Sequence, residues 1–188
     1  MSRHRYVIRH GQSTFNAAFA ETGTDPMHFD ARLSDLGHQQ VQDTRARIAE
    51  LPRPDLIVCT PLTRAIQTTM GIFAGIDAPI LIHSLHRERC EHSCDVGRRP
   101  HELAADFPHL DFAHLDDPWW HDGPGRAPGV PFEPEDVFAA RVSAFAAWLD
   151  ARPEPIIMAV GHGEFFRRLT GRERIANCEI IRLERGDV

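Results

Sequence analysis

The stretch that decides the fold lies near the start of the chain and reads YVIRHG at residues 6–11. Its first three residues are aromatic or β-branched, which favours a buried strand, and the glycine ends the run. A second stretch, IIMAVGHG at residues 156–163, repeats the pattern of an apolar strand followed by histidine and glycine. We therefore expect each strand to deliver one histidine, His10 or His162, to its carboxyl end.

Strands and helices alternate along the rest of the chain. Short apolar runs predict further strands at residues 56–59, 79–83 and 180–183. Apolar residues at helical spacing predict helices over residues 12–20, 34–51, 61–73, 101–107, 133–151 and 165–169. This alternation is typical of an α/β protein, and it predicts a three-layer sandwich in which helices flank a mostly parallel central sheet.

Length and composition indicate one soluble domain. The 188 residues are enough for a single core, so we expect one domain over residues 1–188. A stretch at about 84–132, rich in His, Asp, Pro, Gly and Trp, is expected to be a lid or a substrate-specificity segment. The net charge of -6 argues against a nucleic-acid partner. Four cysteines and no long apolar run predict a cytoplasmic protein without a membrane partner.

Polar side chains follow three of the predicted strands. In a parallel sheet, ligands bind beyond the carboxyl ends of the strands. The side chains expected there are Arg9 with His10, Arg64 and His162. If the three strands are neighbours, two arginines and two histidines converge at one edge of the sheet.

Such a set of side chains suits a phosphoryl group. All 21 basic residues are arginine, and a guanidinium group can donate two parallel hydrogen bonds to an oxyanion. A neutral imidazole nitrogen can attack phosphorus. Thr60 and Pro61 supply a capping hydroxyl and a proline, which predict a helix that begins at Pro61, before Arg64. Its first N–H groups would add further donors for the anion.

Four segments resemble the histidine phosphatase superfamily, in the branch that includes phosphoglycerate mutases. They are RHGQSTFN at 9–16, LS at 33–34 with Gly37 and Gln40, TPLTRAIQT at 60–68, and VGHG at 160–163. One tripeptide is weak evidence, whereas four segments in the right order are a strong signal. The resemblance implies a phosphoglycerate mutase-like fold.

The resemblance also implies roles for individual residues. His10 would be the nucleophile that becomes a phosphohistidine. Arg9, Arg64 and His162 would bind the phosphoryl oxygens, and Asn16 is expected to be a further phosphate contact.

The family uses a carboxylic acid to protonate the leaving oxygen. The segment LHRE at 85–88 resembles the family's acid-bearing segment, which favours Glu88, and Glu91 is the rival. The implied activity is hydrolysis of a small phosphorylated substrate without a metal or other cofactor. A phospho-ligand binding module without catalysis and a phosphoglycerate-type mutase are the alternatives, and the short chain favours hydrolysis over the mutase reaction. The substrate and the oligomeric state are left open.

Three further features need an interpretation. Closely spaced cysteines and histidines can bind zinc, and the chain has such a cluster at His83, His86, Cys90, His92 and Cys94. The cluster lacks the paired Cys-x-x-Cys pattern, so zinc binding is the weaker interpretation. The pair Trp119-Trp120 belongs either to the core or to a lid over the site, and the polar residues around it favour the lid. Glu164 is expected to point away from an anionic substrate. Candidates for binding a second anionic group are His86, Arg98, Arg99 and His121.

Overall fold

The computed structural model describes residues 3–184 and centres on one five-stranded sheet. Its strands are β1 (His4–Arg9), β2 (Leu56–Cys59), β3 (Ile80–Ile82), β6 (Ile156–Gly161) and β7 (Ile180–Leu183). The order across the sheet is β3-β2-β6-β1-β7, with β7 antiparallel to β1 and the other pairs parallel. Because β6 lies between β1 and β2, the three predicted polar strand ends are neighbours.

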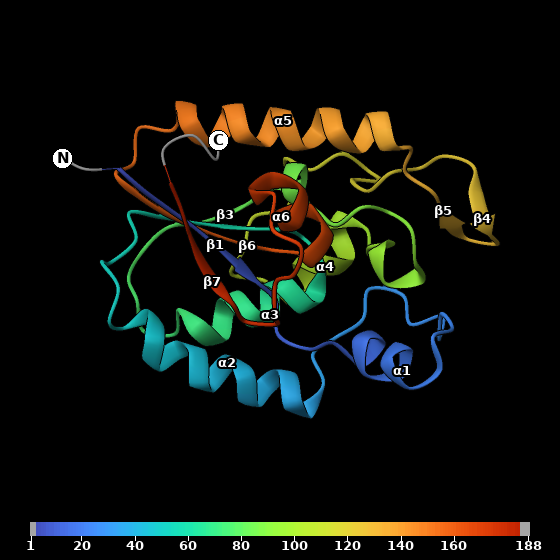
Figure 1. The fold of residues 1–188 in the computed structure, drawn as a ribbon, viewed down its shortest axis with the longest axis horizontal. Helices are drawn as coiled ribbons and strands as arrows, with labels where there is room; N and C mark the ends of the chain where they lie inside the picture. The colour runs from blue at the N-terminus through green and yellow to red at the C-terminus, as the bar shows by residue number, and fades with distance from the viewer. Residues whose placement is uncertain (1–2, 185–188) are drawn as a thin grey trace.

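Helices cover both faces of this sheet (Figure 1). On one face lie α2 (Asp35–Ile48) and α3 (Thr63–Ile72), and on the other lie α5 (Glu135–Ala151) and α6 (Gly163–Thr170). The predicted α/β sandwich with a mostly parallel sheet is confirmed. Among the described residues, no helix combines the length and the apolar character needed to cross a membrane.

Two apolar cores form because the strands are buried on both faces. Successive residues of a strand point to opposite faces of the sheet. In β1, Ile8 therefore packs with residues of α2 and α3, while Val7 packs with residues of α5 and α6, and both side chains are fully buried. This explains why residues 6–8 of β1 and 156–160 of β6 are continuous apolar runs rather than alternating ones.

The start of α3 differs from the prediction. The helix begins at Thr63 rather than at Pro61. Its N-terminus is capped from elsewhere in the chain, because Asp30 accepts hydrogen bonds from the backbone N–H (2.8 Å) and the hydroxyl of Thr63. The hydroxyl of Thr60 instead bonds to His162. The predicted start of the helix is therefore wrong, because the hydrogen-bond partners of Thr63 and Thr60 are Asp30 and His162, which lie far away in sequence.

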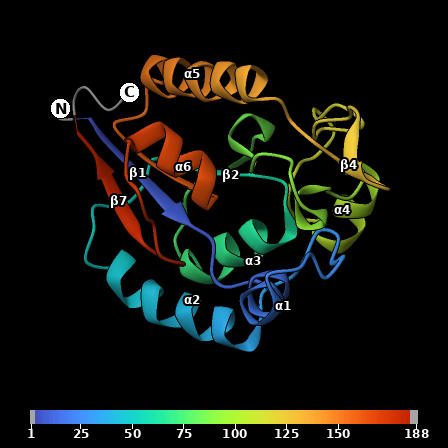
Figure 2. The same ribbon diagram turned by 45° about the vertical axis from the view of Figure 1, so that its right-hand side comes forward.

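The chain between β3 and α5 has little regular structure. It contains 3₁₀ turns at Ser84–His86 and Ser93–Asp95, the helix α4 (Pro100–Asp106) and a hairpin of β4 (Gly125–Ala127) with β5 (Val130–Pro131). Figure 2 shows α1 (Thr14–Thr22), α4 and the hairpin on the side of the molecule toward which the arrow of β1 points.

The prediction that the Trp119-Trp120 pair forms a lid is wrong. Trp119 is 3% exposed and belongs to the apolar core that includes Leu103 and Phe112. Its indole N–H donates to the carbonyl of Arg98 at 2.8 Å, which satisfies the one polar atom of the ring.

Candidate active site

The turn that carries His10 is held by hydrogen bonds from separate segments of the chain. The backbone N–H of His10 donates to Gly161 O at the end of β6 (2.9 Å), and Asn177 Nδ2 donates to His10 O (2.9 Å). The N–H of Gly11 donates to Thr68 Oγ1 on α3 (3.0 Å). The backbone of the turn is thus fixed by β6, α3 and the chain before β7.

The hydrogen bonds of His10 define its tautomer. Its Nδ1 lies 2.7 Å from Gly11 O, and because a carbonyl oxygen only accepts, Nδ1 carries the hydrogen. Burial, with the charges of Arg64 and Arg9, holds the pKa of His10 well below its usual value. The ring is therefore neutral and Nε2 keeps its lone pair, toward which Arg64 Nε donates at 3.2 Å. A neutral imidazole held in this way can act as a nucleophile.

Arg64, the second residue of α3, is held from two sides. It is 2% exposed, and its guanidinium donates to Cys94 O (2.5 Å) and to Asp95 Oδ1 (3.0 Å). The other carboxylate oxygen of Asp95 accepts from the N–H groups of Glu91 (3.3 Å) and His92 (3.1 Å). Burial raises the pKa of Asp95 to about 6, so the carboxylate is ionised and paired with Arg64 at neutral pH.

Two polar atoms beside His10 have no partner. The ring of His162 lies 5.2 Å from that of His10, centroid to centroid, and its Nε2 is 2.7 Å from Thr60 Oγ1. His162 Nδ1 and Arg9 Nε are buried and have no hydrogen-bond partner among residues 3–184. Arg9 crosses the start of α6 closely, since a Cβ at Gly163 would lie 3.0 Å from Arg9 Nε. Buried polar atoms without a partner cost free energy. A ligand bound beside His10 could supply the missing hydrogen-bond partners of these two atoms.

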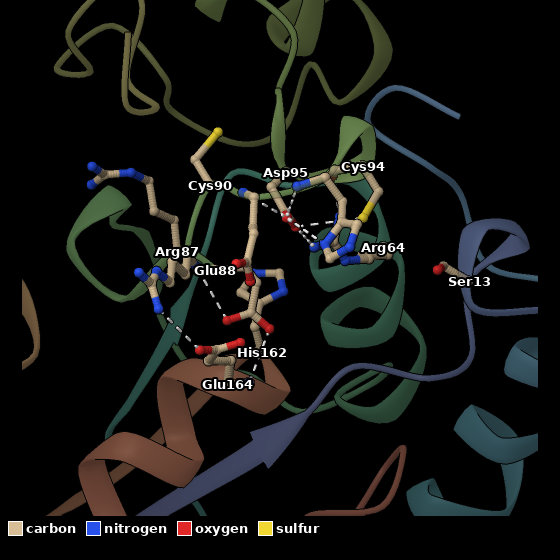
Figure 3. Close-up of polar contacts among 12 residues, drawn as sticks. Ser13, Arg64, Arg87, Glu88, Cys90, Cys94, Asp95, His162 and Glu164 are labelled. Atoms are coloured by element: carbon tan, nitrogen blue, oxygen red, sulfur yellow. Dashed lines mark hydrogen bonds and ion pairs between the residues drawn. The ribbon is translucent and has the colours of Figure 1, made fainter. Parts of the chain in front are cut away.

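Glu88 reaches the same place from the segment after β3. Its carboxylate accepts hydrogen bonds from the backbone N–H groups of Glu164 (3.0 Å) and Phe165 (2.9 Å), in the first turn of α6. Figure 3 shows Glu88, His162 and Arg64 around one space, with Asp95 and Cys94 beside Arg64. The structure thus places a carboxyl group next to the two arginines and two histidines.

These groups border a cavity of about 570 Å³. Of the residues predicted from the sequence, those that line it are Arg9, His10, Asn16, Arg64, Glu88 and the rival Glu91. His162 is not among the lining residues, because it is fully buried, with its ring next to that of His10. Asn16 Oδ1 accepts from the N–H of Ser13 (3.2 Å), while its Nδ2 has no partner within the described part of the chain.

The expectation that Glu164 points elsewhere is wrong. Glu164 lies in the first turn of α6 and lines the cavity. Burial and the charges of Glu88 and Glu91 raise its pKa. Arg89 (3.6 Å) and Arg167 (3.7 Å) pair with its carboxylate and offset part of this crowding of negative charge.

The four candidates for a second anionic group lie outside the cavity. His86 is fully buried and bonds to Val160 O (3.0 Å), Arg98 pairs with Asp30 (2.9 Å), and Arg99 pairs with Asp117. Among residues 3–184, no three His, Cys, Asp or Glu side chains are grouped so as to hold a metal ion. The cavity is lined instead by residues that the sequence did not single out, among them Phe15, Phe19, Asp95, Arg167 and Arg174.

The structure is an α/β fold with a cavity at the carboxyl ends of the central strands, lined by arginines and a neutral histidine. A family model described as the histidine phosphatase superfamily (branch 1) matches residues 5–182. The chain belongs to this superfamily, and the resemblance seen in the sequence is confirmed.

Individual relatives agree with this assignment. The chain is 30% identical to a phosphoglycerate mutase-like protein of Arabidopsis thaliana, over 95% of this chain and 78% of that protein. The solved alpha-ribazole phosphatase from Shigella flexneri shares 20% identity, covers 96% of this chain and 90% of its own, and superposes with a TM-score of 0.66. A mycobacterial glucosyl-3-phosphoglycerate phosphatase has 21% identity, 97% and 91% coverage, and a TM-score of 0.61. The predicted phosphoglycerate mutase-like fold is therefore confirmed.

Proposed function

We propose that this protein is a phosphomonoester hydrolase that works through a phosphohistidine at His10 and acts on a small phosphorylated substrate. The observation that carries the proposal is the state of His10. Its ring is neutral, its Nδ1–H is held by Gly11 O, and its Nε2 lone pair faces the guanidinium of Arg64. Membership of the histidine phosphatase superfamily supports the same chemistry.

In the first step, the phosphoryl group binds among Arg9, Arg64 and His162. His10 Nε2 attacks phosphorus, and the bond between phosphorus and the leaving oxygen breaks. Glu88 gives its proton to that oxygen. No metal is required, because negative charge on the three phosphoryl oxygens is balanced by guanidinium and imidazole donors.

Two groups gain a new hydrogen-bond partner as the substrate binds. Arg64 Nε gives up its hydrogen bond to His10 Nε2 and donates to a phosphoryl oxygen instead. His162 Nδ1 donates to another oxygen, which requires the hydroxyl of Thr60 to donate to His162 Nε2. The free Nδ2 of Asn16 supplies a further donor.

In the second step, water attacks the phosphohistidine. Glu88, now ionised, takes a proton from that water. The bond between nitrogen and phosphorus breaks, inorganic phosphate leaves, and His10 returns to its neutral state. Each catalytic cycle therefore restores the proton on Glu88.

A mutase reaction is the second candidate, and the name of the Arabidopsis relative is the observation that favours it. Both reactions begin with the same phosphohistidine. They differ in whether water or a hydroxyl group of a second sugar-acid phosphate accepts the phosphoryl group. Incubation with labelled phosphoglycerate distinguishes them, because only a mutase moves the label between positions.

The hydrolase proposal is tested with 4-nitrophenyl phosphate and a panel of phosphomonoesters in the presence of a chelator. We expect turnover, and an acid-labile, base-stable phosphoryl label on the protein after rapid quenching. His10→Ala should lower kcat at least about 10³-fold and abolish the label. His101→Ala, at an exposed position on α4, is the matched control and should change neither. Undiminished turnover in His10→Ala overturns the mechanism, and ligand binding without label or turnover indicates a binding module.

A further inference from the structure

The segment that carries Glu88 depends on other parts of the chain for its hydrogen bonds. This segment, residues 83–99, is called the acid segment here, and its only regular elements are the two 3₁₀ turns. Buried backbone N–H and C=O groups outside helices and strands still need partners. For residues 85–90, many of these partners come from one ion pair, Glu133–Arg141.

This ion pair is buried at the start of α5, since Arg141 lies on that helix and Glu133 just before it. Glu133 is 0% exposed and Arg141 7% exposed. The guanidinium of Arg141 donates to both carboxylate oxygens of Glu133, at 2.9 and 2.6 Å, which is a bidentate geometry. It also lies 5.3 Å from the ring of Phe138 and 5.2 Å from the ring of Phe165. Neither member of the pair lines the cavity.

The pair holds the acid segment on both sides of Glu88. Arg141 donates to three backbone carbonyls, those of Leu85 (2.9 Å), Arg87 (2.6 Å) and Glu88 (3.2 Å). Glu133 exchanges hydrogen bonds with Cys90, since its N–H donates to Cys90 O (2.8 Å) and its carboxylate accepts from Cys90 N (3.4 Å). The backbone at Glu88 is therefore fixed before and after the residue.

The same guanidinium connects Glu88 with α6. The carboxylate of Glu88 accepts from the N–H of Phe165, and the ring of Phe165 packs on Arg141. Figures 1 and 2 show α5 and α6 on the same face of the sheet. Arg141 thus contacts both the backbone of Glu88 and the helix that binds its carboxylate.

We propose that Glu133 and Arg141 are positioning residues that orient Glu88 for proton transfer to the leaving oxygen. The inference rests on the proposed hydrolase function. A buried ion pair adds little stability compared with apolar residues of the same size, so its contribution here is geometric. Geometry matters because a shift of about 1 Å in a reacting group can cost about 10²-fold in rate.

Arg141→Lys tests the role with little change in charge. Lysine keeps the positive charge opposite Glu133, but one ammonium group cannot span three carbonyls and a carboxylate. Arg5→Lys is the matched control, because Arg5 is also buried (8% exposed) and also donates to several backbone carbonyls. Those carbonyls lie at the opposite end of β1, away from the cavity. Glu133→Gln, which keeps the shape of the pair, is a second variant with the same expected result.

The kinetic measurement compares two substrates of similar size. Phenyl phosphate needs a proton on its leaving oxygen, whereas 2,4-dinitrophenyl phosphate releases a stable anion. We expect Arg141→Lys to lower kcat/KM, which reports only the steps up to the transfer of the phosphoryl group to His10, about 100-fold on phenyl phosphate and less than about threefold on the dinitrophenyl ester. Glu88→Gln should give the same pattern, and the double variant should be no worse than Glu88→Gln alone. Equal losses on both substrates, or additive losses in the double variant, would overturn the positioning role.

Hydrogen exchange tests the same inference without any catalysis. The amides of Glu164 and Phe165 donate to the carboxylate of Glu88. Their protection should fall at least about tenfold in Arg141→Lys and in Glu88→Gln, and stay unchanged in Arg5→Lys. If the wild-type protein hydrolyses neither ester, the hydrolase proposal fails. Hydrogen exchange then still tests whether Glu133 and Arg141 position Glu88. Unchanged protection in Arg141→Lys would then show that the pair does not hold Glu88.

Discussion

The two sides of the cavity are positioned by different means. The phosphate wall, defined as Arg9, His10, Arg64 and His162, is built on regular elements: β1, β6 and the first turn of α3. The acid segment has only two single 3₁₀ turns and is fixed by side chains that bond to its backbone. The sheet therefore positions the groups of the wall, whereas a buried ion pair positions the acid.

This difference predicts different consequences of substitution and of pH. The histidines of the phosphate wall are buried and neutral, so the wall is sensitive to protonation. The acid segment is sensitive to the loss of single hydrogen-bonding side chains. Changes in the phosphate wall should alter folding stability and the turnover of all substrates alike. Changes in the acid segment should alter only the proton transfer to the leaving group.

The largest expected effect is a loss of stability at acid pH. Burial lowers the pKa of four histidines, to about 4 for His83 and well below the usual value for His10, His86 and His162. Below pH ~6.5 the unfolded chain binds a proton at each of them and the folded protein does not, so stability falls as pH falls. Asp95 acts in the opposite direction, because its pKa is raised to about 6 in the folded protein.

Four histidines, less Asp95 and a fraction of Glu164, give a net uptake of about two to three protons on unfolding near pH 5.5. The free energy of unfolding should then fall by about 3 to 4 kcal/mol per pH unit, as measured by urea denaturation between pH 6 and 5. His86→Phe should reduce this slope by about 1.4 kcal/mol per pH unit, and the exposed-site control His101→Ala should not. A stability that is independent of pH in this range would contradict the neutral, buried state of the wall.

The second effect concerns which carboxyl group is the acid. Glu88→Gln should lower kcat on phenyl phosphate about 10²- to 10³-fold, and Glu91→Gln less than about threefold. Burial acts to lower the pKa of Arg9 and of Arg64, and the charge of Glu88 acts to raise both. Glu88 therefore lies close to the phosphate wall. The reverse result, with the larger loss in Glu91→Gln, would assign the acid to the rival residue.

The sequence predicts the fold and the phosphate wall well because their causes are local. An apolar run followed by Arg9, His10 and Gly11 indicates both a strand and what stands at its end. Ser34 caps α2 as expected, since its side chain accepts from Gly37 N, three residues further on. Even the convergence of the wall follows from a general property of parallel sheets.

The features that were missed depend on residues far apart in the chain. The cap of α3 comes from Asp30, which is 33 residues away from Thr63, and no local pattern marks it. Glu133 and Arg141 look like ordinary charged residues around the start of a surface helix, and only the folded segment 46 to 56 residues earlier gives them a role. Asp95 pairs with Arg64, which lies 31 residues away, so this contact also needs the structure.

The smallest expected effect tests where the two sides meet, at Asp95, which belongs to the acid segment but holds Arg64 of the phosphate wall. Asp95→Asn keeps the size of the side chain and removes its charge. We expect kcat/KM to fall about tenfold at pH 7.5, because Arg64 loses a charged hydrogen bond that fixes its direction. Both substrates of the leaving-group pair should be affected equally, unlike the effect of Arg141→Lys.

The pH profile of this variant separates Asp95 from its neighbours. The charged and titratable groups facing Asp95 are Arg64, Glu88, Cys90, His92 and Cys94. In the wild-type protein, Asp95 takes up a proton below pH ~6 and releases Arg64, so the ratio of wild-type to variant kcat/KM should fall from about ten at pH 7.5 toward one near pH 5. Ionisation of the substrate cancels in this ratio, and His10 stays neutral throughout. A ratio near one already at pH 7.5 would mean that Arg64 is held by the fold of α3 and Cys94 O alone, and that the phosphate wall is independent of the acid segment. A ratio that stays at ten down to pH 5 would mean that Asp95 remains ionised there, which contradicts its raised pKa.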